Sequence, residues 1–133
     1  MTEFRRSNLH SGAPWEAQVA YSRAVRVGRF IAVSGSAAVN EDGQLVGEGD
    51  MYAQARQCIE VITAALERAG ARLSDVVRTR IFVTDIERWD EVGRAHREAF
   101  AEVMPATSMV EVTRLIDPRM LVEIEADAII GDD

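Results

Sequence analysis

Three carboxylates recur at every second position near the end of the chain, in a segment that is otherwise aliphatic. Glu123, Glu125 and Asp127 alternate with Val, Ile and Ala over residues 122–130. On a β-strand, a period of two places the acids on one face and the aliphatic side chains on the other. Three carboxylates side by side are unfavourable unless they meet cations, water or a ligand. The pattern therefore indicates either ion pairs or a site in which a carboxylate moves a proton.

Two arginines offer the structural alternative for these acids. Arg78 and Arg80 share one face of a predicted strand and have the same spacing as the acids. If the two strands are neighbours, we expect cross-strand ion pairs. We assign Glu125 and Asp127 to such pairs. For Glu123 both readings stay open, because a carboxylate in a cleft can also orient an attacking water.

Several kinds of chemistry are excluded or disfavoured by residue type. All fifteen basic residues are arginine, so Schiff-base chemistry on a lysine is excluded, whereas bidentate binding of a carboxylate is not. Cys58 lies among aliphatic residues with no base nearby in sequence, which favours a buried structural thiol. His10 and His96 lack the spacing of zinc ligands, and we expect no metal site.

Length and charge set the broad class of the protein. A chain of 133 residues fits one domain, and we expect residues 1–133 to form it. No run of about 18 apolar residues could span a bilayer. The net charge of −7 disfavours binding to nucleic acid, which depends on cations placed against phosphates. A single cysteine and a beginning that lacks the apolar core of a signal peptide predict a cytoplasmic protein.

Hydrophobic periodicity predicts strands alternating with two amphipathic helices. The expected elements, in order, are strands at 23–27 and 30–34 joined at Gly28-Arg29, a helix between an Asp50 N-cap and Gly70, a strand at 76–84, a helix within 87–103, and closing strands at 105–115 and 121–130. Whether a further short strand precedes them is left open. Residues 11–14 are expected to be a loop, and the second helix should bury Trp89, Val92, His96, Ala99 and Val103.

This order predicts an α+β fold, with a mixed β-sheet and two helices packed on one face. The opposite face of the sheet also needs cover. In a domain of this size another copy of the same chain is the usual solution, so we expect a homo-oligomer.

Several short motifs, spread over most of the chain, are similar to those of the Rid/YjgF family of reactive intermediate deaminases. They are Val33-Ser34-Gly35, Gln54-Ala55-Arg56-Gln57, Phe82-Val83-Thr84-Asp85, Val110-Glu111-Val112 and Val122-Glu123-Ile124-Glu125-Ala126. Any one alone would be weak, whereas together they are specific. The resemblance implies a chorismate-mutase-like fold assembled as a homotrimer, with three clefts between neighbouring subunits.

For the deaminating branch, the resemblance implies hydrolysis of a short-lived imine or enamine without cofactor or metal. An arginine binds the substrate carboxylate, a glutamate positions or activates water, and a tyrosine closes the pocket. By position, Glu123 matches the glutamate, Tyr21 the tyrosine and Gly35 the glycine beside the pocket.

The match fails at the substrate anchor. Thr107 stands where the resemblance places the arginine, and Met109 stands where a cysteine is common. Threonine offers neither charge nor a donor fork, which puts deamination of amino-acid-derived imines in doubt. Arg23, Arg114 and Arg119 are the candidate replacements.

Trp15 with the adjacent Glu16 precedes Tyr21 in the sequence and has two readings. The pair could form a lid over the cleft, or the indole could anchor the loop on a neighbouring subunit.

Two functions from different classes follow. The first is a small hydrolase of a reactive imine, enamine or related metabolite, with Glu123 assisting water and with Tyr21, Gly35, Thr107, Met109 and Trp15 around the ligand. The second is a non-catalytic trimer that binds or senses a small molecule. An endoribonuclease or translation inhibitor ranks below both because the chain lacks a basic stripe.

Overall fold

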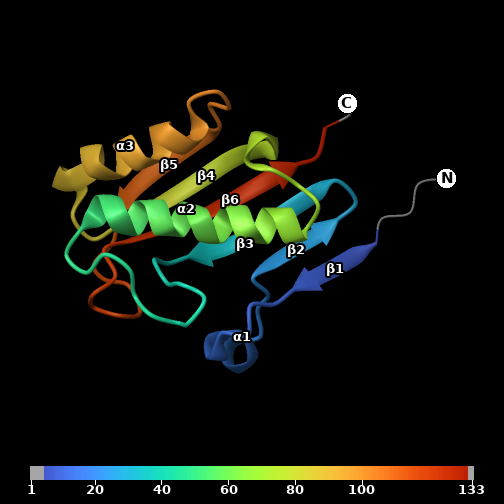
Figure 1. Ribbon diagram of the computed structural model, residues 1–133, viewed down its shortest axis with the longest axis horizontal. Helices are drawn as coiled ribbons and strands as arrows, with labels where there is room; N and C mark the ends of the chain where they lie inside the picture. The colour runs from blue at the N-terminus through green and yellow to red at the C-terminus, as the bar shows by residue number, and fades with distance from the viewer. Residues whose placement is uncertain (1–4, 132–133) are drawn as a thin grey trace.

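The computed structural model describes residues 5–131 as one six-stranded sheet with three helices (Figure 1). The strands are β1 (Arg6–Leu9), β2 (Ala24–Val27), β3 (Phe30–Ser36), β4 (Val76–Val83), β5 (Ala106–Glu111) and β6 (Val122–Ile129). The helices are α1 (Pro14–Val19), α2 (Met51–Arg68) and α3 (Trp89–Phe100), and short 3₁₀ turns span Leu73–Asp75 and Ile86–Arg88.

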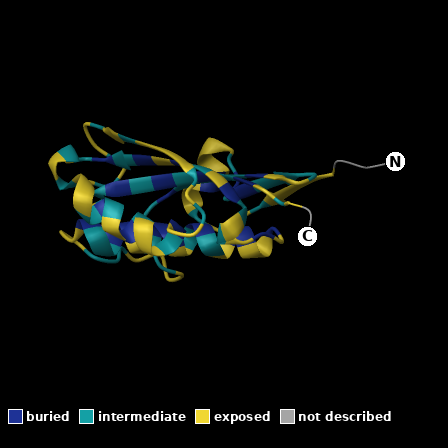
Figure 2. Ribbon diagram, turned by 90° about the horizontal axis from the view of Figure 1, so that it is seen from above, coloured by how far each residue is buried: buried dark blue, intermediate teal, exposed yellow. Residues whose placement is uncertain are grey.

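The sheet is mixed, with strand order β1-β2-β3-β6-β4-β5. Only the β4–β5 pair is parallel, and α3 makes the crossover between these two strands. Helices α2 and α3 lie on the same face of the sheet, and Figure 2 shows the buried residues concentrated between the two layers. The predicted α+β class, with two helices on one face of a mixed sheet, is confirmed. The opposite face, called the open face below, carries Glu123, Glu125 and Asp127, and within residues 5–131 neither α2 nor α3 covers it.

Local signals in the sequence account for the start of α2 and the first hairpin. Asp50 caps α2, since its carboxylate accepts a hydrogen bond from the Ala53 amide at 3.0 Å. Gly28 has a φ of 60° in the two-residue turn that pairs Val27 with Phe30. Both features agree with the sequence prediction.

The core lies between the sheet and the helices. Its largest fully buried aliphatic and aromatic side chains are Ile31, Met51, Ile62, Leu66, Ile81, Ile124 and Phe100. They come from the aliphatic positions of the strands, from the buried face of α2 and, for Phe100, from the end of α3. The strand pattern of period two and the helix pattern of period 3.6 therefore both supply this layer. No helix within residues 5–131 combines the length and apolarity needed to cross a membrane.

Two positions depart from the sequence pattern. Simple alternation along β4 would place Val77 on the same face as Thr79, Ile81 and Val83, but the register of β4 shifts between Val76 and Arg78, so Val76 is buried and Val77 is 44% exposed. This irregularity leaves one extra residue on β4 opposite β6. Trp89 was placed in the buried stripe, yet it is the first residue of α3 and is 59% exposed.

The segment before β2 is more ordered than expected. The expected loop at 11–14 ends one residue early, because α1 begins at Pro14, where a fixed φ and a missing amide proton are well tolerated. The optional first strand is present as β1, which pairs antiparallel with β2.

Gln54 is a fully buried polar residue that fastens two loops to α2. Its amide nitrogen donates to the Gly47 carbonyl at 3.1 Å and to the Arg119 carbonyl at 2.9 Å. Its amide oxygen accepts from the Leu121 amide at 2.8 Å. The chain just before β6 is thereby held against α2.

Replacing Gln54 with Met should therefore destabilise the protein by about 2–4 kcal/mol, because three backbone groups lose the buried side chain that bonds to them while the side-chain volume is kept. Urea unfolding at fixed protein concentration measures the loss. Gln57→Met is the matched control, since Gln57 makes one bond, to the Val39 carbonyl at 3.1 Å. A loss no larger than the control's would contradict this role of Gln54.

Candidate functional site

A bulge in β3 brings the backbone of Gly35 against the carboxylate of Glu123. Pairing between β3 and β6 shifts after Val33, and it resumes with Ser36 opposite Ile124. A Cβ atom added at Gly35 would lie 2.3 Å from Oε2 of Glu123 and 2.9 Å from its Cδ. The glycine is therefore required for this approach. It lets the carboxylate lie directly against the strand.

Glu123 differs from the two other acids of β6 in its surroundings. Arg80 lies opposite Glu125 in the register and contacts the carboxylates of Glu125 at 3.4 Å and Asp127 at 3.1 Å, as the ion-pair reading predicted. Glu123 instead lies opposite Phe82. Within residues 5–131 no ion pair holds its carboxylate.

Burial raises the pKa of the Glu123 carboxyl above its usual value of 4.5, with the positive charge of Arg23 acting against the rise and the negative charge of Glu125 adding to it. A partly desolvated carboxyl with a raised pKa holds a proton more readily than an exposed one, which suits it to accept and return a proton.

Arg23 lies on the other side of Gly35, immediately before β2. Its backbone is fixed by two bonds, from its own amide to the Leu9 carbonyl and from the Ser34 amide to its carbonyl. The guanidinium Nη2 donates to the Gly35 carbonyl at 2.6 Å, while Nε is buried without a partner among the described residues. Arg23 was one of the three candidate cations, and the structure places it close to Glu123.

Helix α1 contributes a second buried acid near Arg23. Glu16 is 4% exposed and accepts hydrogen bonds from the amide and hydroxyl of Ser11, and it contacts Nδ1 of His10 at 3.1 Å. Burial acts to raise the pKa of Glu16, but the bonds from Ser11 and His10 and the charge of Arg23 lower it overall. Glu16 points inward, whereas Trp15 is half exposed on the surface of α1.

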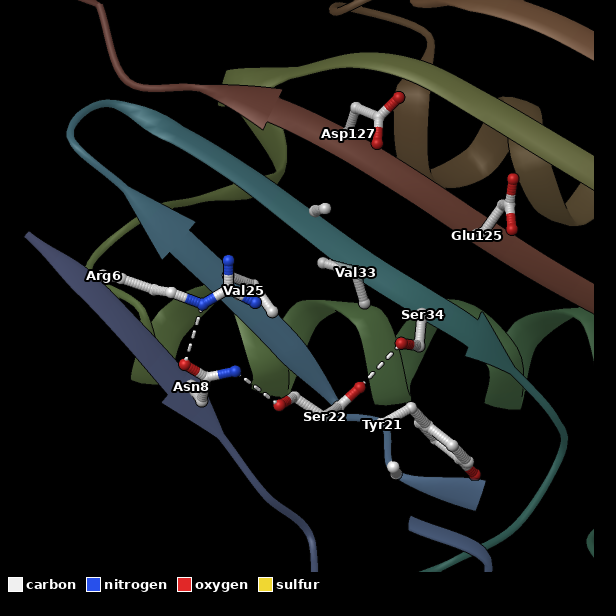
Figure 3. A pocket seen from close by; sticks show the side chains of 11 residues that line it. Arg6, Asn8, Tyr21, Ser22, Val25, Val33, Ser34, Glu125 and Asp127 are labelled. Carbon is white, nitrogen blue, oxygen red and sulfur yellow. Dashed lines mark hydrogen bonds between the residues drawn. The ribbon is translucent and has the colours of Figure 1, made fainter. Parts of the chain in front are cut away.

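A hollow of about 410 Å³ lies on the open face, beside the Gly35 bulge. Its lining includes Tyr21, Ser34, Glu125 and Asp127 (Figure 3). Gly35 follows Ser34 along β3, so the hollow borders the bulge. Tyr21, the predicted pocket tyrosine, thus lies on the same side of the sheet as Glu123.

Thr107 and Met109 lie elsewhere in the single chain. Thr107 is on β5, and its hydroxyl bonds to the hydroxyl of Thr79 at 2.8 Å and donates to the Pro105 carbonyl at 3.1 Å. Thr79 is fully buried on the helix-covered face, where its hydroxyl also contacts Nε2 of His96 at 2.9 Å. Met109, opposite Ile81, packs against the core.

The sheet therefore brings Tyr21, Gly35 and Glu123 to one face and turns Thr107 toward the other. Two strands separate β5 from β3, so one chain does not form the full set of predicted contacts. A shared pocket requires a second copy. His96, expected on the buried stripe of this helix, also bonds to Thr79, and its position on α3 was the one feature of the sequence that pointed toward the sheet.

The remaining candidates have other surroundings. Arg119 forms an ion pair with Asp117 at 2.8 Å and approaches Glu48 at 3.9 Å. Arg114 is exposed in the loop after β5. Cys58 is buried. Desolvation is the main cause that raises the pKa of its thiol, and the negative charge of Glu123 adds to the rise, so the thiol stays protonated. Residues 5–131 contain no cluster of three or more His, Cys, Asp or Glu side chains able to hold a metal ion.

Comparison with known proteins agrees with this fold. The family model described as Endoribonuclease L-PSP matches residues 11–130. A curated protein of Salmonella typhimurium named 2-iminobutanoate/2-iminopropanoate deaminase is 37% identical over 113 residues, covering 82% of this chain and 86% of that protein. An uncharacterized protein of Streptomyces coelicolor, SCO2049, is 37% identical over 131 residues, covering 98% of this chain and 97% of that protein.

Solved structures give the same result. Rv2704 of Mycobacterium tuberculosis, described as a member of the YjgF/YER057c/UK114 family, has a TM-score of 0.87 and 51% identity, covering 95% of this chain and 100% of that chain. The YjgF gene product of E. coli has a TM-score of 0.79 and 32% identity, covering 97% of this chain and 98% of that chain. The chain belongs to the YjgF/Rid family, whose model carries the L-PSP description.

Gly35→Ala tests the close approach at the bulge. We expect the fold to survive, because the new methyl group meets the end of a flexible side chain, and we expect the Glu123 carboxylate to swing away from the strand. A crystal structure of the variant locates the carboxylate. Gly93→Ala is the control, since its Cβ would meet only the Trp89 ring at 3.8 Å. An unmoved carboxylate would contradict the described packing.

Glu123→Gln tests the raised pKa through the pH dependence of stability. Below pH 4.5 the carboxyl is protonated in both states, whereas between 4.5 and the raised native pKa the unfolded state releases the proton more readily. Raising the pH through this window should therefore lower the unfolding free energy of the wild type relative to the variant. Urea unfolding across a pH series measures this, and a difference that stays constant or changes in the opposite direction would refute it.

Proposed function

We propose that the protein is a small hydrolase of a reactive imine or enamine, working at a cleft between subunits. The observation that carries the proposal is the environment of Glu123: it lies against Gly35, has no ion pair within residues 5–131, and has a pKa raised by burial. The relative named 2-iminobutanoate/2-iminopropanoate deaminase supports the choice of an imine.

The chemistry needs one group that exchanges a proton. Glu123 accepts a proton from a water molecule while the water oxygen bonds to the imine carbon, and the carboxyl returns this proton to the imine nitrogen, giving a carbinolamine. Glu123 then takes the remaining hydroxyl proton and passes it to the nitrogen as the C–N bond breaks, so ammonia leaves and the carbonyl forms. Water and imine are converted to ammonia and a carbonyl compound, and Glu123 ends in its starting state.

A homotrimer is the assembly that we propose for this cleft. On the open face, Phe30 and Ile129 are register partners and are 44% and 49% exposed, so an apolar pair lies uncovered in the single chain. A second copy on this face would also bring β5, with Thr107 and Met109, toward the Glu123 site of its neighbour. Trp15 remains a candidate lid residue of the same cleft, and the cytoplasm is the compartment that we propose.

The second candidate is a non-catalytic trimer that binds a small molecule. The hydrogen bonding of Thr107 favours it, because the hydroxyl that replaces the expected arginine is already engaged by Thr79 and Pro105. An endoribonuclease ranks third. The row of Glu123, Glu125 and Asp127 on the open face opposes binding of a polyanion.

Freshly generated imines of neutral and acidic amino acids provide the test. We expect the wild type to release ammonia faster than buffer alone. The Glu123→Gln variant should have a rate at least about 100-fold lower than the wild type, in line with the contribution of general acid–base catalysis. Glu125→Gln is the matched control, two residues along the same face, and should keep most of the activity.

The outcome separates the candidates. No acceleration by the wild type for any imine would remove the hydrolase proposal, and retained affinity for a ligand in Glu123→Gln would then support a binder. Equal losses in the two variants would show that Glu123 has no special role.

A further inference from the structure

The guanidinium of Arg23 is short of hydrogen-bond acceptors. Within residues 5–131 it has a single acceptor, the Gly35 carbonyl at 2.6 Å from Nη2, and its Nε is buried with none. An arginine has five N–H donors, and a buried donor such as this Nε is unfavourable without an acceptor. Such a group is typical of a site completed by something outside the chain.

The carboxylates near Arg23 do not complete it. Glu16 and Glu123 interact electrostatically with Arg23, yet neither forms an ion pair with it in the described part of the chain. The oxygens of Glu16 are already used by Ser11 and His10. Glu123 is held on the far side of Gly35. The cation therefore keeps donors for a further acceptor.

The other cations are less suitable for this site. Arg80 is paired with Glu125 and Asp127, and Arg119 is paired with Asp117. Arg114 is exposed in a loop beyond the edge strand β5. Thr107 is neutral, and its hydroxyl is bonded on the helix-covered side of the sheet. Of these four arginines, Arg23 is the one that combines a restrained position with unused donors beside Glu123.

We propose that Arg23 is the ligand-binding cation of the Glu123 site and that it holds a carboxylate of a small 2-imino or 2-oxo acid. The inference rests on the proposed function for the identity of the ligand class. It adds that anchor and proton-transfer group come from the same chain, on either side of the Gly35 bulge. A ligand held in this way has its carboxylate toward β2 and its reacting carbon toward β6.

The bond to Gly35 gives Arg23 a second effect. Because Nη2 holds the Gly35 carbonyl, the guanidinium also fixes the bulge against which the Glu123 carboxylate lies. Loss of Arg23 should therefore act in two ways: it removes the cation that binds the carboxylate, and it frees the Gly35 carbonyl at the bulge. A test must separate this direct effect from a change in the bulge.

Binding of 2-oxobutanoate, which is not itself an imine, is compared with binding of 2-butanone, which has a methyl group in place of the carboxylate. Calorimetric titration or ligand-observed NMR measures both affinities. We expect Arg23→Gln to weaken the binding of 2-oxobutanoate by about tenfold or more, as for loss of a charge-assisted bond, and to leave the affinity for 2-butanone unchanged. Arg114→Gln is the matched control and should retain both affinities.

The proposal is overturned if Arg23→Gln weakens the binding of both ligands equally or leaves the affinity for 2-oxobutanoate unchanged. It is also overturned if Arg114→Gln, and not Arg23→Gln, loses affinity, or if the wild type does not bind 2-oxobutanoate. If Arg23→Gln does not fold, Arg23→Lys takes its place, with the same selective loss expected and an equal loss for both ligands contradicting it. The readout is equilibrium binding. If Arg23 binds the carboxylate selectively but the protein does not hydrolyse imines, this inference holds and only the proposal of a hydrolase is refuted.

Discussion

The contact between Gly35 and Glu123 is the constraint on which the site depends. A carboxylate can lie this close to a neighbouring strand only where no Cβ stands in its way, and a methyl at Gly35 would come within 2.3 Å of Oε2. The bulge in β3 turns this residue toward β6, and Arg23 holds its carbonyl. Position, desolvation and a raised pKa of one carboxyl thus follow from a single backbone feature.

Strand register divides three similar acids into two roles. Glu125 and Asp127 contact Arg80, so their charges are balanced across the β4–β6 pair. Glu123, two residues earlier, lies opposite Phe82 and has no cation there. A shift of one residue in the pairing would turn all three acids into the core. The pattern that first suggested chemistry is therefore mostly structural, and one member remains available for a ligand.

Much of the fold could be predicted because it depends on local patterns: the α2 stripe, the Asp50 cap and the turn at Gly28 each have a signal in neighbouring residues. Features that depend on pairing between distant segments could not. The irregularity that exposes Val77 arises between β4 and β6, and the unsatisfied guanidinium of Arg23 depends on β3 lying beside it. Glu123 and Gly35 were identified through resemblance, but their contact needed coordinates.

The most direct measurement of the central claim is a site-specific NMR titration of the Glu123 carboxyl in the native assembly. The structure predicts a pKa above 4.5, since burial outweighs the opposing charge of Arg23. The Arg23→Gln protein should show a further rise, because the stabilising positive charge is removed. A pKa at or below 4.5 in the wild type, or a fall in Arg23→Gln, would contradict a desolvated carboxyl beside a cation at the Gly35 bulge.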